Sequence, residues 1–142
     1  MHSDQHMPEP NIYRTASPSW RFWYKGGLYQ EFKGEFKAKR KLNFGGHFYM
    51  TADDPLRKGS KRGQIALRFY NKEEGGMLIS EALAVPGVTA NSAVSTWIRA
   101  SGHTEIPRRT RRIQFVVSCE GYQSGDGSFL ADDFFLEEAV EE

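Results

Sequence analysis

The sequence predicts an all-β fold, an antiparallel β-sandwich or jelly roll that forms a single domain. Three observations lead to this prediction. The chain has 142 residues, the size of one ordinary domain. Its ten Phe, six Tyr, three Trp, fourteen Gly and six Pro favour short strands separated by turns. From Trp20 onward, segments with a period of two follow one another, and no long stretch has the period of a helix.

Eight strands are expected, and turn-forming residues separate them. In chain order they are Trp20–Tyr24, Leu28–Phe32, Leu42–Met50, Gln64–Tyr70, Met77–Ile79, Thr96–Ala100, Arg112–Cys119 and Phe129–Leu136. Pairs such as Gly26-Gly27, Gly75-Gly76 and Pro86-Gly87 supply turns between them. Helical turns are expected only over Ser80–Ala84 and in the acidic tail Glu137–Glu142.

The chain divides into three parts. Residues 1–19 are polar, contain three of the prolines, and are expected to form a flexible arm, tag or linker. Residues 20–137 form the predicted domain, and residues 138–142 form an acidic tail. The N-terminal residues lack the apolar core of a signal peptide, so we expect an intracellular protein or a piece of a longer chain. No apolar run approaches the ~20 residues that cross a bilayer, so no membrane partner is expected.

Alternation assigns a buried and an outward face to each strand, because successive side chains point in opposite directions. The residues expected to share one core are Ile65, Leu67, Phe69, Ile113, Phe115, Val117, Phe134 and Leu136, and the inward set of the strand Leu42–Met50 is Leu42, Phe44, Phe48 and Met50. Cys119, the single cysteine, ends an apolar alternation and has no disulfide partner. We therefore expect a buried structural thiol rather than a nucleophile.

The outward residues of three strands form the predicted ligand-binding face. These residues are His47, Tyr49, Arg68, Tyr70 and Gln114. We expect them to be exposed together, because a jelly roll of this kind would place their strands in one sheet. Aromatic rings stack on the apolar face of a sugar, and amide and guanidinium groups bind its hydroxyls. The alternative is that they are ordinary solvent-facing strand residues, among which Tyr and Arg are common.

A series of motifs in the chain occurs in a characteristic order. A strand with Trp97 leads through Ile106-Pro107 to the apolar strand Arg111–Val117, and the last strand reads Phe-Leu-Ala-Asp-Asp-Phe-Phe-Leu from Phe129. Earlier segments fit the same order, namely Gly27–Phe32, Lys41–Tyr49, and Gln64–Asn71 with the Gly75-Gly76 turn. Over about residues 27–137 the chain resembles carbohydrate-binding-module-like β-jelly rolls of the galactose-binding-like type.

The resemblance implies a non-catalytic module that binds polysaccharide as an accessory part of a larger exported protein, extracellular or periplasmic. Two departures from the family pattern stand out. The family's opening strand, Asn-Gly-x-Phe-Glu, whose acidic residue often joins a structural calcium, has no counterpart here. In addition, the turns before two strands, which tend to contain Ala-Gly in the family, here contain Lys39-Arg40-Lys41 and Arg108-Arg109.

Asp132 and Asp133 are the candidate metal ligands, because adjacent acids can supply oxygens to a hard cation such as calcium. Period two places Asp132 on the same face as Leu130, Phe134 and Leu136, so its carboxylate approaches the edge of the core. A carboxylate in that position needs a partner. Calcium, backbone N–H groups and an arginine are the alternatives.

Three basic clusters, Lys37–Lys41, Arg57–Arg62 and Arg108–Arg112, occur at predicted turns. They are either solvated loops or contacts for an acidic polysaccharide, because arginine binds carboxylate and sulfate with two hydrogen bonds. No nucleic-acid partner is expected, since the net charge is only +1 and no nucleic-acid-binding motif is present.

No catalytic arrangement is apparent. His47 and His103 have no neighbouring Ser/Asp signature, and no two carboxylates are marked by their spacing as a glycosidase pair. The functional hypothesis is a carbohydrate-binding accessory module, a monomer or part of a multidomain chain. The alternative is a structural spacer or protein-interaction domain with the same fold and no glycan binding. A third hypothesis is a glycan-active enzyme, which would need two carboxylates or a group of residues around a histidine to converge in a cleft.

Overall fold

The computed structural model describes residues 2–3, 6–9, 19–22, 26–57, 61–121 and 127–139. Ten strands lie in these ranges: β1 (His2–Ser3), β2 (His6–Glu9), β3 (Ser19–Phe22), β4 (Gly26–Lys33), β5 (Lys41–Tyr49), β6 (Arg62–Tyr70), β7 (Leu78–Leu83), β8 (Ile98–Glu105), β9 (Arg112–Glu120) and β10 (Phe129–Glu138). No helix occurs in the described ranges, so none there could span a membrane.

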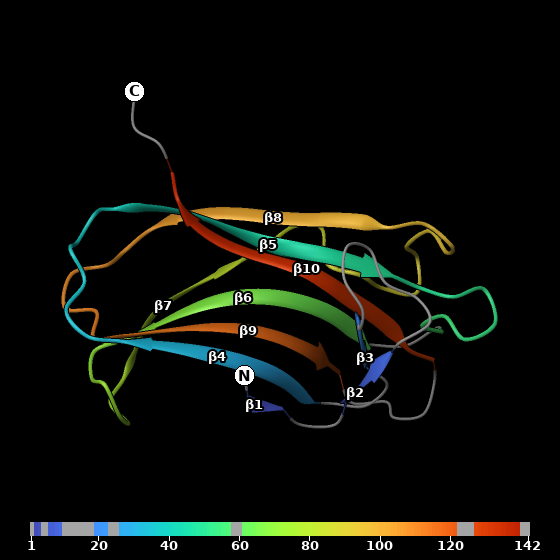
Figure 1. Ribbon diagram of the computed structural model, residues 1–142, viewed down its shortest axis with the longest axis horizontal. Coiled ribbons are helices and arrows are strands. Elements are labelled where there is room, and N and C mark those ends of the chain that lie inside the picture. Colours follow the sequence, from blue (N-terminus) through green and yellow to red (C-terminus); the bar gives the residue numbers. More distant parts are fainter. Residues whose placement is uncertain are drawn as a thin grey trace.

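The strands form two antiparallel sheets that pack face to face. Sheet A has the strand order β1-β4-β9-β6-β7, and sheet B has the order β2-β3-β10-β5-β8. In Figure 1, β8, β5 and β10 of sheet B lie above β6, β9 and β4 of sheet A, and these three strands of sheet A are arcs whose ends bend away from β5 and β10. The outer face of sheet A is therefore concave. The predicted all-β sandwich is confirmed.

All eight expected strands are present, with ends shifted by a few residues. The largest difference concerns Ser80–Ala84, for which the sequence prediction of a helical turn was wrong. Residues 80–83 belong to β7, whose backbone pairs with β6 from Ala66 to Tyr70. Glu137 and Glu138 likewise extend β10 instead of starting a helix, whereas residues 140–142 lie outside the described part.

Within the predicted arm, two short segments pair with the sandwich. β1 pairs with β4, and β2 pairs with β3. The remaining residues of the arm, apart from Ser19 in β3, lie outside the described ranges. The domain boundaries at residues 20 and 137 stay a prediction.

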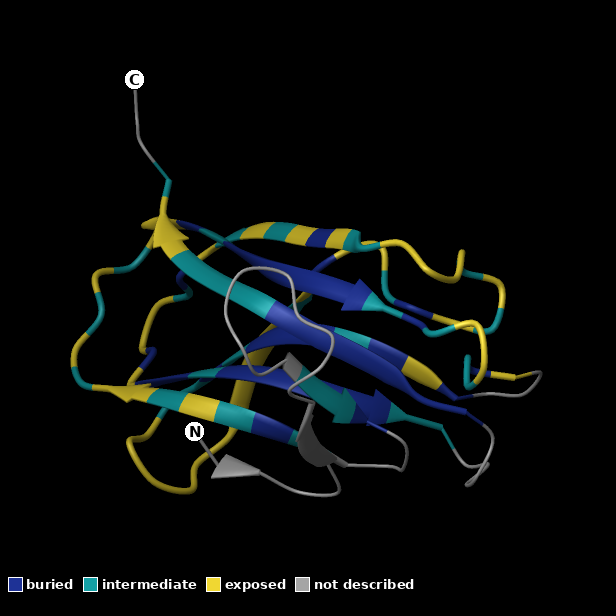
Figure 2. Cartoon of the chain, turned by 45° about the vertical axis from the view of Figure 1, so that its right-hand side comes forward, coloured by how far each residue is buried: buried dark blue, intermediate teal, exposed yellow. Residues whose placement is uncertain are grey.

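One hydrophobic core fills the space between the sheets. Buried residues follow the central strands of both sheets (Figure 2). Ile65, Leu67 and Phe69 of β6 are fully buried there, together with the predicted residues of β5 and β9. Phe134 and Leu136 are half-buried and pack against the same cluster. The core prediction is thus confirmed for the residues of β5, β6 and β9, where period two fixes which side chains meet, whereas Phe134 and Leu136 are buried only in part.

A β-bulge in β10 changes which residues of that strand face the core. The register to β5 shifts between Asp132 and Phe135, and Asp133 has a φ of 53°. Asp132 pairs with His47 on the outer side, whereas Phe134 lies on the inner side, where its ring would be 2.8 Å from a Cβ added to Gly46. The expectation that Asp132 shares a face with Phe134 and Leu136 was therefore wrong, because one extra residue inverts the alternation.

Candidate functional site

The five predicted ligand-binding residues lie on two opposite faces of the sandwich. Arg68, Tyr70 and Gln114 belong to β6 and β9 of sheet A, whereas His47 and Tyr49 belong to β5 of sheet B. The expectation that their strands share one sheet was wrong. Alternation along a strand distinguishes inward from outward residues, but it does not determine which sheet the strand joins.

A polar row crosses the concave outer face of sheet A. The strand register places Glu31, Gln114, Arg68 and Glu81 next to one another across β4, β9, β6 and β7. Gln114 Nε2 donates to Glu31 Oε2 over 3.4 Å, and Arg68 Nε donates to Glu81 Oε2 over 2.6 Å. Burial alone would lower the pKa of Arg68, but the hydrogen bond to Glu81 and the charge of that carboxylate raise it above its ordinary value. Arg68 therefore remains charged.

An apolar row lies directly beside the polar row. Its members, Tyr29, Val116, Ala66 and Leu83, face one another across the same four strands. Val116 and Ala66 are buried in its middle, whereas Leu83 is 46% exposed at the edge of the sheet. Tyr29 is half-buried at the other end. The two rows thus run in parallel, two residues apart along each strand, and the apolar row is accessible at its two ends, Tyr29 and Leu83.

On the other side of the polar row, Arg112 and Tyr70 form a rigid unit. The guanidinium of Arg112 lies 4.1 Å from the ring centroid of Tyr70 and 3.0 Å from the carboxylate of Glu31. It also donates to the carbonyl oxygens of Lys72, Glu73 and Gly75. Arg112 is only 8% exposed. Its guanidinium therefore stabilises the loop after β6 and the position of the Tyr70 ring, and it is not available to solvent.

The outer face of sheet B is built differently. Tyr49 and Trp97 pack with their ring centroids 5.0 Å apart, and the guanidinium of Arg99 lies 5.0 Å from the Phe135 ring centroid. His47 is only 6% exposed, although its side chain points outward from β5. A sugar approaching this face would therefore meet Tyr49 but not the imidazole of His47.

The two predicted calcium ligands, Asp132 and Asp133, lie at the bulge of β10. Asp132 is 8% exposed, and its carboxylate accepts a hydrogen bond from the backbone N–H of Asp133 over 2.7 Å. His47 Nδ1 lies 3.8 Å from Asp133 Oδ2. Calcium takes six to eight oxygens. Across the described ranges no three His, Cys, Asp or Glu side chains are grouped to hold a metal. These two carboxylates alone do not make up such a ligand set, and calcium stays a prediction.

The sequence interpretation missed four residues of the sheet A face, namely Tyr29, Glu31, Glu81 and Leu83. The alternation of the strand Leu28–Phe32 already points Tyr29 and Glu31 outward, opposite the core residue Leu28. No outward strand face was assigned to Glu81 and Leu83, because the segment Ser80–Ala84 was expected to form a helical turn.

Comparison with known proteins gives structural matches and no sequence matches. No protein-family model matches the chain, and no curated protein matches it. The structure of the CBM22-1–GH10 modules of Clostridium thermocellum endo-1,4-β-D-xylanase 10B, complexed with xylohexaose, has a TM-score of 0.66 at 10% identity over 99% of this chain. This chain spans only 25% of that structure.

Two smaller structures match over most of their own length. A family 16 carbohydrate-binding module has a TM-score of 0.65 at 12% identity, with 94% of this chain and 86% of that chain covered. TmCBM61 in complex with β-1,4-galactotriose has a TM-score of 0.55 at 20% identity, with 96% and 86% covered. The predicted resemblance to carbohydrate-binding-module-like jelly rolls is confirmed at the level of the fold.

Proposed function

We propose that this chain is a non-catalytic carbohydrate-binding module and that the concave outer face of sheet A holds the polysaccharide. The observation that carries the proposal is the polar row of Gln114 and Arg68 beside the apolar row of Tyr29 and Leu83. A pyranose ring has an apolar face and a rim of hydroxyl groups. The two parallel strips match these two surfaces.

The chemistry of the polar row suits sugar hydroxyls. Gln114 offers both a donor and an acceptor, and the carboxylates of Glu31 and Glu81 accept from hydroxyl groups. Existing contacts to Glu31 and Glu81 fix the side chains of Gln114 and Arg68 before any ligand arrives, which reduces the entropic cost of binding. Solvated hydroxyls must still exchange water for protein, so we expect affinities of roughly micromolar to millimolar.

Charges on this face are balanced, since Arg68 pairs with Glu81 and Arg112 with Glu31. The face therefore suits a neutral stretch of polysaccharide. The oligosaccharides named with two of the similar structures, xylohexaose and β-1,4-galactotriose, support a carbohydrate ligand. We also propose that the chain serves as an accessory module in an exported carbohydrate-active protein. The match to a quarter of a xylanase structure that also contains GH10 modules supports this proposal.

Substitution on the two outer faces tests the proposal. Arg68→Ala and Gln114→Ala should each weaken binding to the best ligand of a polysaccharide panel about tenfold, roughly 1.4 kcal/mol. Tyr49→Ala, on the outer face of sheet B, is the matched control and should leave binding unchanged. Affinity electrophoresis measures binding, and melting curves verify the fold.

If both sheet A variants bind as the unaltered chain does while Tyr49→Ala does not, the binding face is that of sheet B. If the unaltered chain binds no polysaccharide in the panel, the proposed function is wrong. The spacer or protein-interaction hypothesis would then replace it.

A further inference from the structure

Two turns at one end of the sandwich lie side by side. Residues 34–40 join β4 to β5, and residues 106–111 join β8 to β9. Lys39 N donates to the carbonyl oxygen of Ile106, and Ile106 N donates to that of Arg40, both over 2.8 Å. This region presents seven exposed cationic side chains, here called the basic end: Lys37, Lys39, Arg40, Lys41, Arg108, Arg109 and Arg111.

Few carboxylates neutralise the basic end. Arg40 Nη1 lies 2.7 Å from Glu138 Oε2, and Arg111 Nη1 lies 3.0 Å from Glu35 Oε1. Glu105 is the cross-strand neighbour of Lys41. Among the residues that the structure describes, none forms an ion pair with Lys37, Lys39, Arg108 or Arg109. The basic end therefore carries a substantial excess of positive charge that faces solvent.

The backbone gives a second, independent indication. Lys39 has a φ of 68° and Arg109 a φ of 70°, so each turn places a long cationic residue in the left-handed region. Glycine adopts this conformation freely, whereas a residue with a Cβ is disfavoured there. Turn stability alone would select glycine at both positions. That both are cationic indicates that the charge itself serves a purpose.

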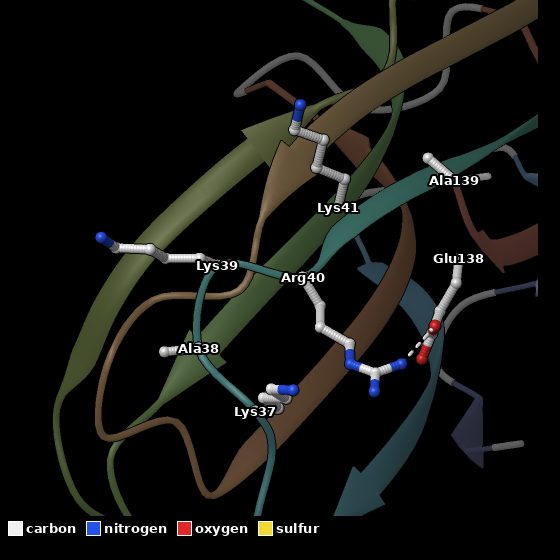
Figure 3. Close-up of a pocket in the computed structure, with 7 residues that line it drawn as sticks. All are labelled: Lys37, Ala38, Lys39, Arg40, Lys41, Glu138 and Ala139. Carbon is white, nitrogen blue, oxygen red and sulfur yellow. Dashed lines mark hydrogen bonds and ion pairs between the residues drawn. The ribbon is translucent and has the colours of Figure 1, made fainter. Parts of the chain in front are cut away.

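The first turn also borders a concavity. A pocket of about 420 Å³ is lined by Lys37, Ala38, Lys39, Arg40, Lys41, Glu138 and Ala139. In Figure 3, Arg40 reaches to Glu138, while Lys39 and Lys41 extend in other directions. The cations thus spread over the surface instead of converging on one point, which suits a polymer with repeated negative charges better than a single small anion.

We propose that the basic end binds the acidic groups, uronate carboxylates or sulfates, of a polyanionic polysaccharide. The assignment to a polysaccharide rests on the function proposed above. The basic end adjoins the concave face of sheet A. Lys33, the last residue of β4, and Arg112, the first residue of β9, are paired on that face, and each is directly next to one of the two turns. A long glycan held on that face can therefore extend over the cations.

A nucleic acid fits this end less well. Single strands are usually held by aromatic side chains on which bases stack, and duplexes by a helix or ribbon that enters a groove. The basic end consists of two turns, and the one aromatic residue in them, Phe36, packs against the core. Lysine and arginine side chains on turns can contact carboxylate and sulfate groups without stacking aromatic residues and without an element that enters a groove.

Binding of heparin and polygalacturonate to the chain, measured at two salt concentrations, tests the proposal. We expect both to bind, and added salt to weaken binding because exposed charges are screened. The double variant Lys39→Gly/Arg109→Gly should lower the affinity about fivefold or more, a loss consistent with two exposed charge contacts. Its melting temperature should not fall, because glycine fits both backbone positions. Glu138→Gln should strengthen binding, since it frees Arg40.

Arg57→Gln is the matched control, because Arg57 is an exposed cation that forms an ion pair with Asp54 in the loop after β5, whereas the basic end precedes β5. It should leave heparin binding unchanged. Unaltered affinity of the double variant would overturn the proposal, and so would tighter binding of a DNA duplex than of heparin. If neutral xylan fails to bind while heparin binding still depends on Lys39 and Arg109, glycan binding on the outer face of sheet A is contradicted. Binding of acidic groups at the basic end is then supported independently.

Discussion

Cys119 shows how strongly one buried position fixes the chemistry of a side chain. It is fully buried in β9, within the core cluster, and its cross-strand neighbours are Gly26 and Gly63. Burial raises the pKa of the Cys119 thiol from its ordinary value of 9.0 to about 11. A neutral thiol in this position is a packing residue, as the sequence predicted, because the thiolate is the nucleophilic form.

The raised pKa of Cys119 predicts a stability change at alkaline pH. Between about pH 9 and pH 11 the unfolded chain loses the thiol proton while the folded chain keeps it, so the contribution to stability is complete below pH 9 and declines as the pH rises. Over this range the unfolding free energy of the unaltered chain should fall by about 2 kcal/mol relative to that of Cys119→Ala. Urea unfolding at pH 8 and pH 11 measures the difference. A difference that stays constant with pH would contradict the prediction.

At the scale of strands, alternation predicted which residues are buried but not which strands are neighbours. Ile65, Leu67 and Phe69 alternate without interruption, and all three lie in the core. Arg68 and Gln114 were likewise correctly placed together, since β6 and β9 pair directly. Strand pairs in this sandwich join distant segments, such as β4 with β9, and nothing in the local pattern of β5 indicates that it pairs with β10. The misplacement of His47 and Tyr49 follows from this.

Besides the pairing of strands, the bulge of β10 is a feature that period-two alternation does not predict. Asp133, with its φ of 53°, adds a residue to the strand and turns Asp132 away from the core. Asp tolerates the left-handed region better than most residues do, which is the one local signal in the sequence for a bulge at this position.

Calcium at Asp132 and Asp133 has a direct test at this bulge. If the ion binds, a chelator should lower the melting temperature, because a ligand that binds only the folded chain stabilises it by mass action. Added calcium should restore the original value, and added magnesium serves as the control. Identical melting curves with and without chelator would reject the site. Asp132 would then be satisfied by protein donors, of which the Asp133 N–H is one.

At the scale of the whole molecule, one core joins the two sheets. Phe115 of sheet A packs edge-on against Phe134 of sheet B with ring centroids 6.0 Å apart. Within sheet B, Phe129 stacks on Phe22 at 5.1 Å and contacts Phe48 at 5.5 Å. Neither sheet can bury its inner face alone, so we expect the sandwich to unfold in one cooperative step.

Phe115→Ala tests this cooperativity. Phe115 is buried at the sheet interface, and its truncation should lower the unfolding free energy by about 3–5 kcal/mol. Phe32→Ala is the control, because Phe32 lies on the same face of sheet A but is 37% exposed, so its loss should cost clearly less. Trp20 of β3 reports on sheet B through its fluorescence, whereas circular dichroism reports on both sheets. The unfolding midpoints of the two signals should shift together in Phe115→Ala, because removing this side chain of sheet A weakens the packing against the inner face of sheet B. Separate midpoints would show that the sheets unfold independently.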